Sequence, residues 1–272
     1  YLWGYNWYYP VAMVECSDLD SFKDKVDTSG LNVGDFTQIR KKLVSFRLKC
    51  RDVPDMFVNT YEYKPLVGLS YLKSQSGSIF DYEYDGLGRL CRTFVRNGTT
   101  HEKELLSSYS YSYGPSAGGN RIRARDYLSA DAASFKETNT YHDLLGRPVE
   151  TVMTAASPAG KDIVLLSEYD DFGRPYRKFC PVPMTTSTGA YASFSDIHPE
   201  ILKFYNWEVY AFSKTLYDDS PLDRPVEEYG PGSPWHTRGK SVKTSYLVND
   251  GSGLLSCSGY LVESDTSLTC VG

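Results

Sequence analysis

Two pairs of adjacent aspartates are the residues in this chain whose type and spacing are best suited to chemistry. They are Asp170-Asp171 and Asp218-Asp219. Carboxylate oxygens are the ligands that Ca²⁺ prefers, and two carboxyl groups can divide acid and base catalysis between them. Aspartate is also common at the start of tight turns, where it accepts hydrogen bonds from backbone N–H groups. We favour the turn interpretation, with calcium binding and acid catalysis as the alternatives.

Three familiar catalytic patterns begin in the sequence, but none is completed. His101-Glu102 lacks the second His of a zinc-protease helix, and residues 68–72 lack the second Gly of a nucleophile elbow. Gly239-Lys240-Ser241 is similar to the end of a phosphate-binding loop, but Pro234 occupies the position of its first Gly. We therefore expect that the chain is not an enzyme and has no cofactor and no metal site.

The six cysteines are widely spread and do not form a metal-binding pattern. They are Cys16, Cys50, Cys91, Cys180, Cys257 and Cys270. No pair has the Cys-x-x-Cys spacing of a zinc site. Free buried thiols are the favoured interpretation. An even number also allows disulfides in an oxidising compartment, with Cys257 and Cys270 as the closest pair in sequence.

Charge and length exclude some classes of partner. The net charge is −5 and the sequence pI is about 5.5, so the chain has no electrostatic reason to bind nucleic acid or anionic membranes. Mean hydropathy is −0.40, and we find no apolar run long enough to span a bilayer. The 272 residues begin at Tyr1. We expect a piece of a longer protein or a trimmed chain.

Composition and periodicity predict a mainly β protein. The chain has 23 Tyr against 12 Phe, with 22 Gly and 14 Pro, which is typical of half-exposed strands joined by tight turns. Strict alternation in residues 57–63, 80–84 and 108–113 predicts antiparallel strands. Asn97-Gly98 predicts a hairpin. Near the N-terminus we expect strand around Pro10, a short helix from Ser17 to about residue 26, and an amphipathic helix over residues 35–48.

The later part of the chain contains more irregular sequence. Residues 114–120 are rich in Gly and predict a loop, and residues 181–200 are rich in Pro, Ser and Thr. A short helix is expected to begin at His198 and to reach Trp207. Residues 230–239 predict a rigid loop, and the tail at 240–271 predicts weak strands.

One short segment occurs in four copies. It begins with an aromatic residue and Asp, and it ends with Gly and Arg or with Arg alone. The copies contain Tyr84, Asp85, Gly88 and Arg89; Asp143, Gly146 and Arg147 after His142; Tyr169, Asp170, Gly173 and Arg174; and Asp218 and Arg224 after Tyr217, with Asp223 in place of Gly. Residues 63–68 are a degenerate relative without Asp and Arg. Such internal repetition is a stronger guide to the fold than any single motif.

The repeated unit is readable as a hairpin. Asp at the first position of a turn accepts backbone N–H bonds, and Gly supplies the positive φ that closes a type I turn into a hairpin. The following Arg can reach the Asp carboxylate or stack on a Tyr ring. We therefore expect one bend of fixed register, copied along a sheet.

This pattern resembles the Rhs/YD-repeat family, whose hallmark is Tyr-Asp-x-x-Gly-Arg. YLWGYNWYYPVA near the start, TYEYKPLVGL at 60–69 and the block from Tyr141 to residue 235 are similar to Rhs-family proteins of the Bacteroidetes type. The resemblance covers most of the chain except roughly residues 15–55 and 114–135. It implies a ribbon of hairpins that closes into a hollow shell, which in relatives encloses a cytotoxic C-terminal domain. It also implies a location outside the cell or on the outer-membrane surface.

The resemblance and the periodicity together divide the chain into three parts. We assign residues 1–56 to an N-terminal strand and helical segment, 57–113 to YD-repeat hairpins, and 114–272 to a second YD-repeat β region. The expected function is structural, as part of a shell or surface scaffold, with other parts of the same long chain as partners, including a C-terminal effector domain. The alternative is a surface module that binds a glycan or a protein through exposed aromatic residues. Its candidates are Trp3, Trp7, Trp207 and Trp235.

Overall fold

The computed structural model describes residues 1–25, 28, 30–32, 36–51, 53, 55–115 and 118–247, together with the backbone of two strands near the C-terminus. The first elements are β1 (Leu2–Gly4), β2 (Tyr9–Cys16), α1 (Leu19–Lys25), α2 (Phe36–Arg51), β3 (Met56–Lys64), β4 (Gly68–Lys73), β5 (Ile79–Tyr84), β6 (Leu90–Arg96), β7 (Lys103–Ser112), β8 (Asn120–Tyr127), β9 (Phe135–His142) and β10 (Pro148–Met153). They are followed by β11 (Ile163–Tyr169), β12 (Pro175–Phe179), β13 (Val182–Pro183), α3 (Phe194–Phe204), β14 (Phe212–Tyr217), β15 (Pro225–Tyr229), α4 (Ser233–Thr237), β16 (Val242–Lys243), β17 (Gly259–Ser264) and β18 (Ser267–Val271).

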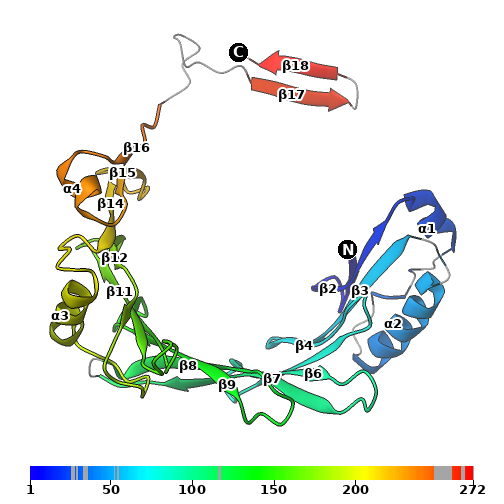
Figure 1. Cartoon of the computed structure of the whole chain (residues 1–272). Coiled ribbons are helices and arrows are strands. Elements are labelled where there is room, and N and C mark those ends of the chain that lie inside the picture. The colour runs from blue at the N-terminus through cyan, green and yellow to red at the C-terminus, as the bar shows by residue number, and fades with distance from the viewer. Residues whose placement is uncertain are drawn as a thin grey trace. The chain divides into compact units, whose positions relative to one another are not determined.

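Most strands pair with their neighbours in the chain, whereas β12 pairs with β14 and β13 with β11, and every described pair is antiparallel (Figure 1). Where a short turn connects two strands, this arrangement follows from sequence, because such turns can join only antiparallel strands. The prediction of a mainly β fold built from antiparallel hairpins, with helices near the N-terminus, is confirmed. None of the described helices is long and apolar enough to cross a bilayer.

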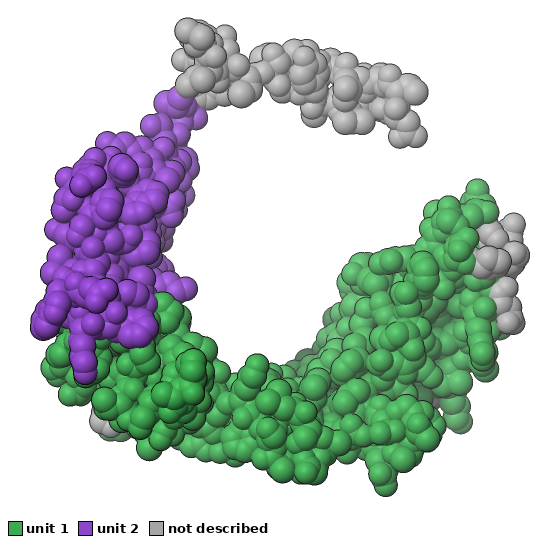
Figure 2. All heavy atoms as spheres, in the orientation of Figure 1, with its two compact units in different colours: residues 1–166, 181–200 green, residues 167–180, 201–272 purple. Residues whose placement is uncertain are grey.

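The chain divides into two compact units (Figure 2). The first contains residues 1–166 and 181–200, and the second contains residues 167–180 and 201–272. In the first unit, β1 to β10 follow in order, and β13 pairs with the start of β11. The second unit contains the end of β11, then β12, β14, β15 and β16. The two domain boundaries expected from sequence, after residues 56 and 113, both lie inside the first unit. The second of them falls between β7 and β8, which pair with each other.

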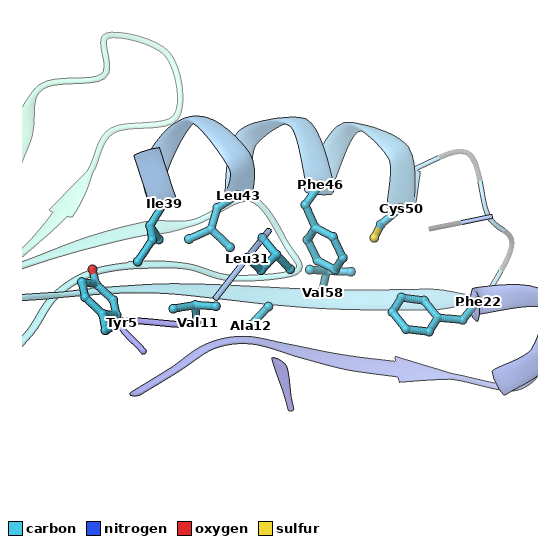
Figure 3. Packing of buried hydrophobic residues seen from close by; sticks show 10 residues of the cluster. All are labelled: Tyr5, Val11, Ala12, Phe22, Leu31, Ile39, Leu43, Phe46, Cys50 and Val58. Carbon is cyan, nitrogen blue, oxygen red and sulfur yellow. The ribbon is translucent and has the colours of Figure 1, made fainter. Parts of the chain in front are cut away.

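A hydrophobic core lies where α2 covers the strands at the N-terminal end of the first unit (Figure 3). Ile39, Leu43, Phe46 and Cys50 recur at helical spacing, and their side chains are buried. Figure 3 shows them directed from the helix toward the strands that it covers, which include β3 with Val58. The amphipathic pattern predicted for residues 35–48 therefore places the helix correctly, and α2 continues to Arg51.

Arg47 lies outside the apolar face of α2, yet its guanidinium is bound within the structure and is not left in solvent. Its Nη1 donates to the carbonyls of Val58 at 2.7 Å and Lys73 at 3.1 Å, and its Nη2 donates to that of Ser74 at 2.8 Å. Partial burial lowers the pKa of this guanidinium. The long apolar stem of Arg lets it cross the core edge and bind strand carbonyls, so this residue fastens the helix to the sheet.

The hairpin predicted at Asn97-Gly98 is present between β6 and β7. Its turn is wide, because Asn97 N–H donates to the Glu102 carbonyl and His101, not Gly98, has the left-handed backbone (φ 61°). The predicted start of the later helix needs correction. Helix α3 begins at Phe194, four residues before the expected start. Its first turn contains one of the two bonds of a capping box, in which Ser193 N–H donates to Asp196 Oδ2 at 3.2 Å.

The cysteines that the structure describes with side chains are Cys16, Cys50, Cys91 and Cys180, and all four are free thiols. Burial raises the pKa of Cys50 to about 11, so this thiol is a protonated core residue at neutral pH. The alternative pairing of Cys257 with Cys270 lies outside the residues whose side chains are described. β17 and β18 form an antiparallel pair of their own.

Candidate functional site

The repeated segment forms a hairpin turn in which the aspartate organises the backbone. In the turn between β5 and β6, Asp85 N–H donates to the Arg89 carbonyl at 2.9 Å, and Gly88 N–H donates to the Asp85 carbonyl at 3.0 Å. Gly88 has φ 76°, the left-handed conformation in which glycine is least strained. These bonds define a type I turn closed by a left-handed residue.

The two carboxylate oxygens of Asp85 have separate tasks. Oδ1 accepts the backbone N–H groups of Leu87 at 2.9 Å and Arg89 at 3.0 Å. Oδ2 accepts the Arg89 side chain through Nε at 2.7 Å and Nη2 at 2.6 Å. One side chain therefore fixes both the bend and the direction in which the arginine leaves it.

Asp143 and Asp170 repeat this geometry. Each accepts two backbone N–H groups on Oδ1 at 2.9–3.0 Å and the following arginine Nε on Oδ2 at 2.7–2.8 Å. Gly146 and Gly173 have φ 81° and 86°. His142 occupies the position before Asp143 without changing the turn, because the turn's hydrogen bonds come from the residues after it.

The fourth copy reaches the same closure by another route. Asp218 N–H donates to the Arg224 carbonyl at 3.0 Å, and Asp218 Oδ2 accepts Arg224 Nε at 2.7 Å across a longer turn. Asp223 stands where the other copies have Gly, and it has φ 51°. Aspartate tolerates the left-handed region better than most residues, so the missing Gly is replaced in conformation as well as in position.

The same irregularity of pairing follows each turn. Tyr84 pairs with Leu90, but Glu83 pairs with Arg92, so Cys91 is left as a bulge. The residue two positions after the arginine is skipped in the same way in the other copies, and the degenerate hairpin skips its equivalent. The skipped residues are Ser70, Cys91, Val149, Tyr176 and Val226. A bulge increases local twist and bends its strand, so each hairpin receives the same bend.

Tyrosines join consecutive hairpins in the first unit. The Tyr84 hydroxyl donates to the Leu69 carbonyl at 2.8 Å, on the return strand of the preceding hairpin. Tyr111 does the same to Leu90 at 2.8 Å, and the Arg89 guanidinium lies 4.2 Å from the centre of the Tyr111 ring. Asp85 thus binds Arg89 within the turn, and Arg89 stacks on the ring of Tyr111 in the next strand.

The second unit repeats this link twice. The Tyr217 hydroxyl donates to the Pro175 carbonyl at 2.8 Å, and Arg174 lies 4.6 Å from its ring centre. Tyr246 donates to the Pro225 carbonyl at 3.1 Å beneath Arg224, at 4.8 Å. We call this chain of contacts, from Asp to Arg within a turn and from Arg to a Tyr in or just after the next strand, the hairpin ladder.

Two further turns share the backbone frame without the aspartate. Ser74 N–H donates to the Ser78 carbonyl and Ser157 N–H to that of Lys161, and each turn closes on a left-handed Gly. In the second, Ser157 Oγ accepts Lys161 N–H at 2.8 Å. A search for Asp or Ser three positions before Gly would have found both, because a hydroxyl accepts the same backbone bond as a carboxylate.

The turn aspartates are held ionised. The hydrogen bond from the Arg89 guanidinium is the main cause that lowers the pKa of Asp85. The pKa of Asp218 is lowered first by the Ser220 hydroxyl and then by Arg224. At Asp170 partial burial acts to raise the pKa, but hydrogen bonds from Arg174 outweigh it and lower the value. The adjacent aspartates therefore differ in role, since Asp171 is exposed.

The four tryptophans lie in different settings. Trp7 and Trp207 are 70% and 74% exposed, whereas Trp3 in β1 is 42% and Trp235 in α4 is 37% exposed. A Cβ at Gly230 would lie 2.7 Å from the Trp235 indole, so that ring is packed on the backbone. The four predicted stacking residues are therefore not equivalent.

A hollow of about 970 Å³ opens between α2 and strands of the first unit. Two of the arginines that line it, Arg40 and Arg47, are engaged in holding the structure together. Arg40 binds buried Glu62 through Nε at 3.0 Å and Nη2 at 2.9 Å, and Arg47 binds strand carbonyls. Within the described residues, no group of three or more His, Cys, Asp or Glu side chains is arranged to hold a metal ion.

Comparison with known proteins finds a family model similar to part of the chain and solved structures of related fold. None of the curated proteins matches it. Among solved structures, "Crystal Structure of TcdB2-TccC3" matches with 13% identity over 63% of this chain and 10% of that one, with a TM-score of 0.42. "Crystal Structure of TcdB2-TccC3-Cdc42" matches with 15% identity over 69% and 7%, with a TM-score of 0.38. The chain spans about a tenth or less of the length of these proteins.

The family match falls on the ladder itself. Three of the four aspartate–arginine turns, those of Asp143, Asp170 and Asp218, lie between residues 119 and 248. Residues 119–248 match the model of the family described as "Domain of unknown function (DUF6443)".

Proposed function

We propose that the chain is a structural section of an Rhs-type protein, in which hairpins lie side by side to form part of a wall or scaffold. The hairpin ladder carries this proposal. Each of the four arginines is neutralised by its own aspartate. Arg89, Arg174 and Arg224 also stack on a tyrosine further along the chain, so the polar groups of these repeats are used within the sheet. Side chains engaged in this way fix the register of the strands and make the sheet rigid, as a wall requires.

The proposal includes partners and location. A section of wall pairs with more of the same long chain, and a C-terminal effector domain enclosed by that wall is the further partner. We place the protein outside the cell or on the outer-membrane surface, and we propose no enzymatic activity for this section. Protease treatment of intact cells, followed by detection with an antibody against this chain, tests the location. Full protection of the chain would contradict it.

Hydrogen exchange tests the ladder directly. Arg174→Ala removes the guanidinium that lies over Tyr217, and Tyr217→Phe removes the hydroxyl donated to Pro175. Both variants should accelerate amide exchange in β14 as well as in β12, since the contacts join the two strands. Lys178→Ala, in β12 but outside the turn, is the matched control. Acceleration in β12 alone for Arg174→Ala would mean that the hairpins are independent and would refute the wall proposal.

Binding of a glycan or of a surface protein is a second candidate function. It is favoured by the high exposure of the Trp7 and Trp207 side chains, because large aromatic rings that remain in water are available to a partner. Screening the chain on a glycan array, followed by titration with any glycan that is retained, tests the glycan part of this candidate. The absence of saturable binding would remove glycan binding and leave the structural proposal unaffected.

A further inference from the structure

The tripeptide Tyr-Asn-Trp occurs twice, at residues 5–7 and 205–207, and folds into the same turn each time. In the first copy, Tyr8 N–H donates to the Tyr5 carbonyl at 3.3 Å. In the second, Glu208 N–H donates to the Tyr205 carbonyl at 3.1 Å. We call these two segments the Tyr-Asn-Trp turns. One lies in each compact unit.

The backbone of both turns is left-handed at Asn and Trp. The φ values are 56° and 70° at Asn6 and Trp7, and 52° and 62° at Asn206 and Trp207. Two successive positive φ values with this hydrogen bond are those of a type I′ turn. Asn is favoured at the first central position of that turn and Gly at the second. Both copies therefore place the largest side chain where the smallest would be least strained.

The turns are held by groups other than the indole. Tyr5 is buried, its hydroxyl accepts Tyr63 N–H at 3.0 Å, and Trp7 N–H donates to Asn32 Oδ1 at 2.8 Å. The second turn is held by Trp207 N–H, which donates to the Leu202 carbonyl at 2.6 Å at the end of α3. Backbone strain that surrounding groups enforce, at a residue whose side chain is mostly in solvent, points to a role outside the fold.

The side chains presented together are an indole and a carboxamide. Asn6 and Asn206 are exposed, and the neighbouring Trp rings are 70% and 74% exposed. An indole face accepts the C–H groups of a pyranose ring, and a carboxamide offers one acceptor and two donors to its hydroxyls. A lipid surface or a protein core would have no use for the adjacent carboxamide, since that group would have to be desolvated.

We infer that each Tyr-Asn-Trp turn is a saccharide-binding site, which stacks its indole on a pyranose ring with equatorial substituents. This inference rests on the second candidate function and narrows it to one ligand class and two sites. Trp3 and Trp235 are excluded from the sites, because the first belongs to a strand and the second packs on Gly230.

Replacing the tryptophans with glycine separates binding from folding. Trp7→Gly and Trp207→Gly remove the indole and install the residue that the turn favours, so both variants should keep or raise the thermal midpoint. The probes are hexamers of β-1,4-linked glucose and of β-1,4-linked N-acetylglucosamine, titrated calorimetrically into the whole chain. The original chain should bind two equivalents of at least one probe, each single variant one, and the double variant none. Trp235→Phe is the control and should still bind two.

Several outcomes would overturn the inference. Lower thermal midpoints in the glycine variants would make the indoles structural. Absence of saturable binding to either hexamer would exclude a saccharide as the ligand. If the double variant still bound a hexamer, the chain would bind glycans at a site other than the Tyr-Asn-Trp turns. Binding to phosphatidylcholine vesicles that the double variant loses, without hexamer binding, would assign the turns to lipid. The hairpin ladder is unaffected by these results, because it is measured by exchange in β12 and β14.

Discussion

Asp170→Ala should destabilise the hairpin of β11 and β12 by about 2 kcal/mol. The structure supplies the magnitude in two parts. Oδ1 accepts the N–H groups of Phe172 and Arg174, an arrangement like a helix N-cap, whose loss costs about 1 kcal/mol. Oδ2 forms a partly exposed ion pair with the Arg174 side chain, which contributes up to about 1 kcal/mol more. Asp170→Asn keeps the Oδ1 acceptor and should lose only the second part.

The assay combines global and local measurements. Urea unfolding followed by far-ultraviolet circular dichroism gives the free-energy difference, and amide exchange at Phe172 and Arg174 reports on the turn. Asp171→Ala is the matched control, because it removes the adjacent, exposed carboxylate from the same turn. If Asp170→Ala and Asp171→Ala unfolded at the same urea concentration with equal exchange rates, the carboxylate would not organise the turn, and the reasoning would fail.

Three further predictions concern single residues. Burial raises the pKa of Glu150 to about 7, so the free energy of unfolding should fall as pH rises from about 4.5 through 7. Glu150→Gln should remove this pH dependence and raise the free energy of unfolding by about 3 kcal/mol at pH 8. Urea unfolding at pH 5 and pH 8 measures both, and an unchanged pH dependence in the variant would contradict this. Gly88→Ala should lower the free energy of unfolding by about 1 kcal/mol, because φ is 76° at this residue. Gly86→Ala is the control and should be neutral, because no heavy atom lies within 4 Å of the added Cβ. Equal melting temperatures of the two variants would argue against the turn geometry. Asp223→Gly should stabilise the protein by about 0.5 kcal/mol in the same thermal assay, because it relieves a left-handed φ of 51° and loses only a weak, exposed contact with Arg174. A lower melting temperature of this variant would count against this account.

Much of the fold was predictable because its determinants are local. Alternating residues identify strands one at a time, and antiparallel order follows once the connections are short. The aspartate turn is similarly readable, since all of its hydrogen bonds join residues no more than four apart in three of the copies. The early start of α3 was predictable in the same way, because Ser193 and Asp196 have the recognisable spacing of a capping box.

Non-local contacts could not be predicted from these patterns. The pairing of Arg89 with Tyr111 and of Arg174 with Tyr217 joins residues 22 and 43 positions apart, and it depends on register between strands. The position of Arg47 against the carbonyls of Val58, Lys73 and Ser74 depends on how α2 lies on the sheet.

Sequence alone therefore determined the repeated bend, its aspartate and glycine, and the antiparallel strands between the bends. Tertiary structure decided which ring lies beneath each arginine and which tryptophans remain in water. The reason is physical: a turn is closed by bonds within a few residues, whereas stacking and exposure depend on the placement of strands that the chain brings together only when it folds.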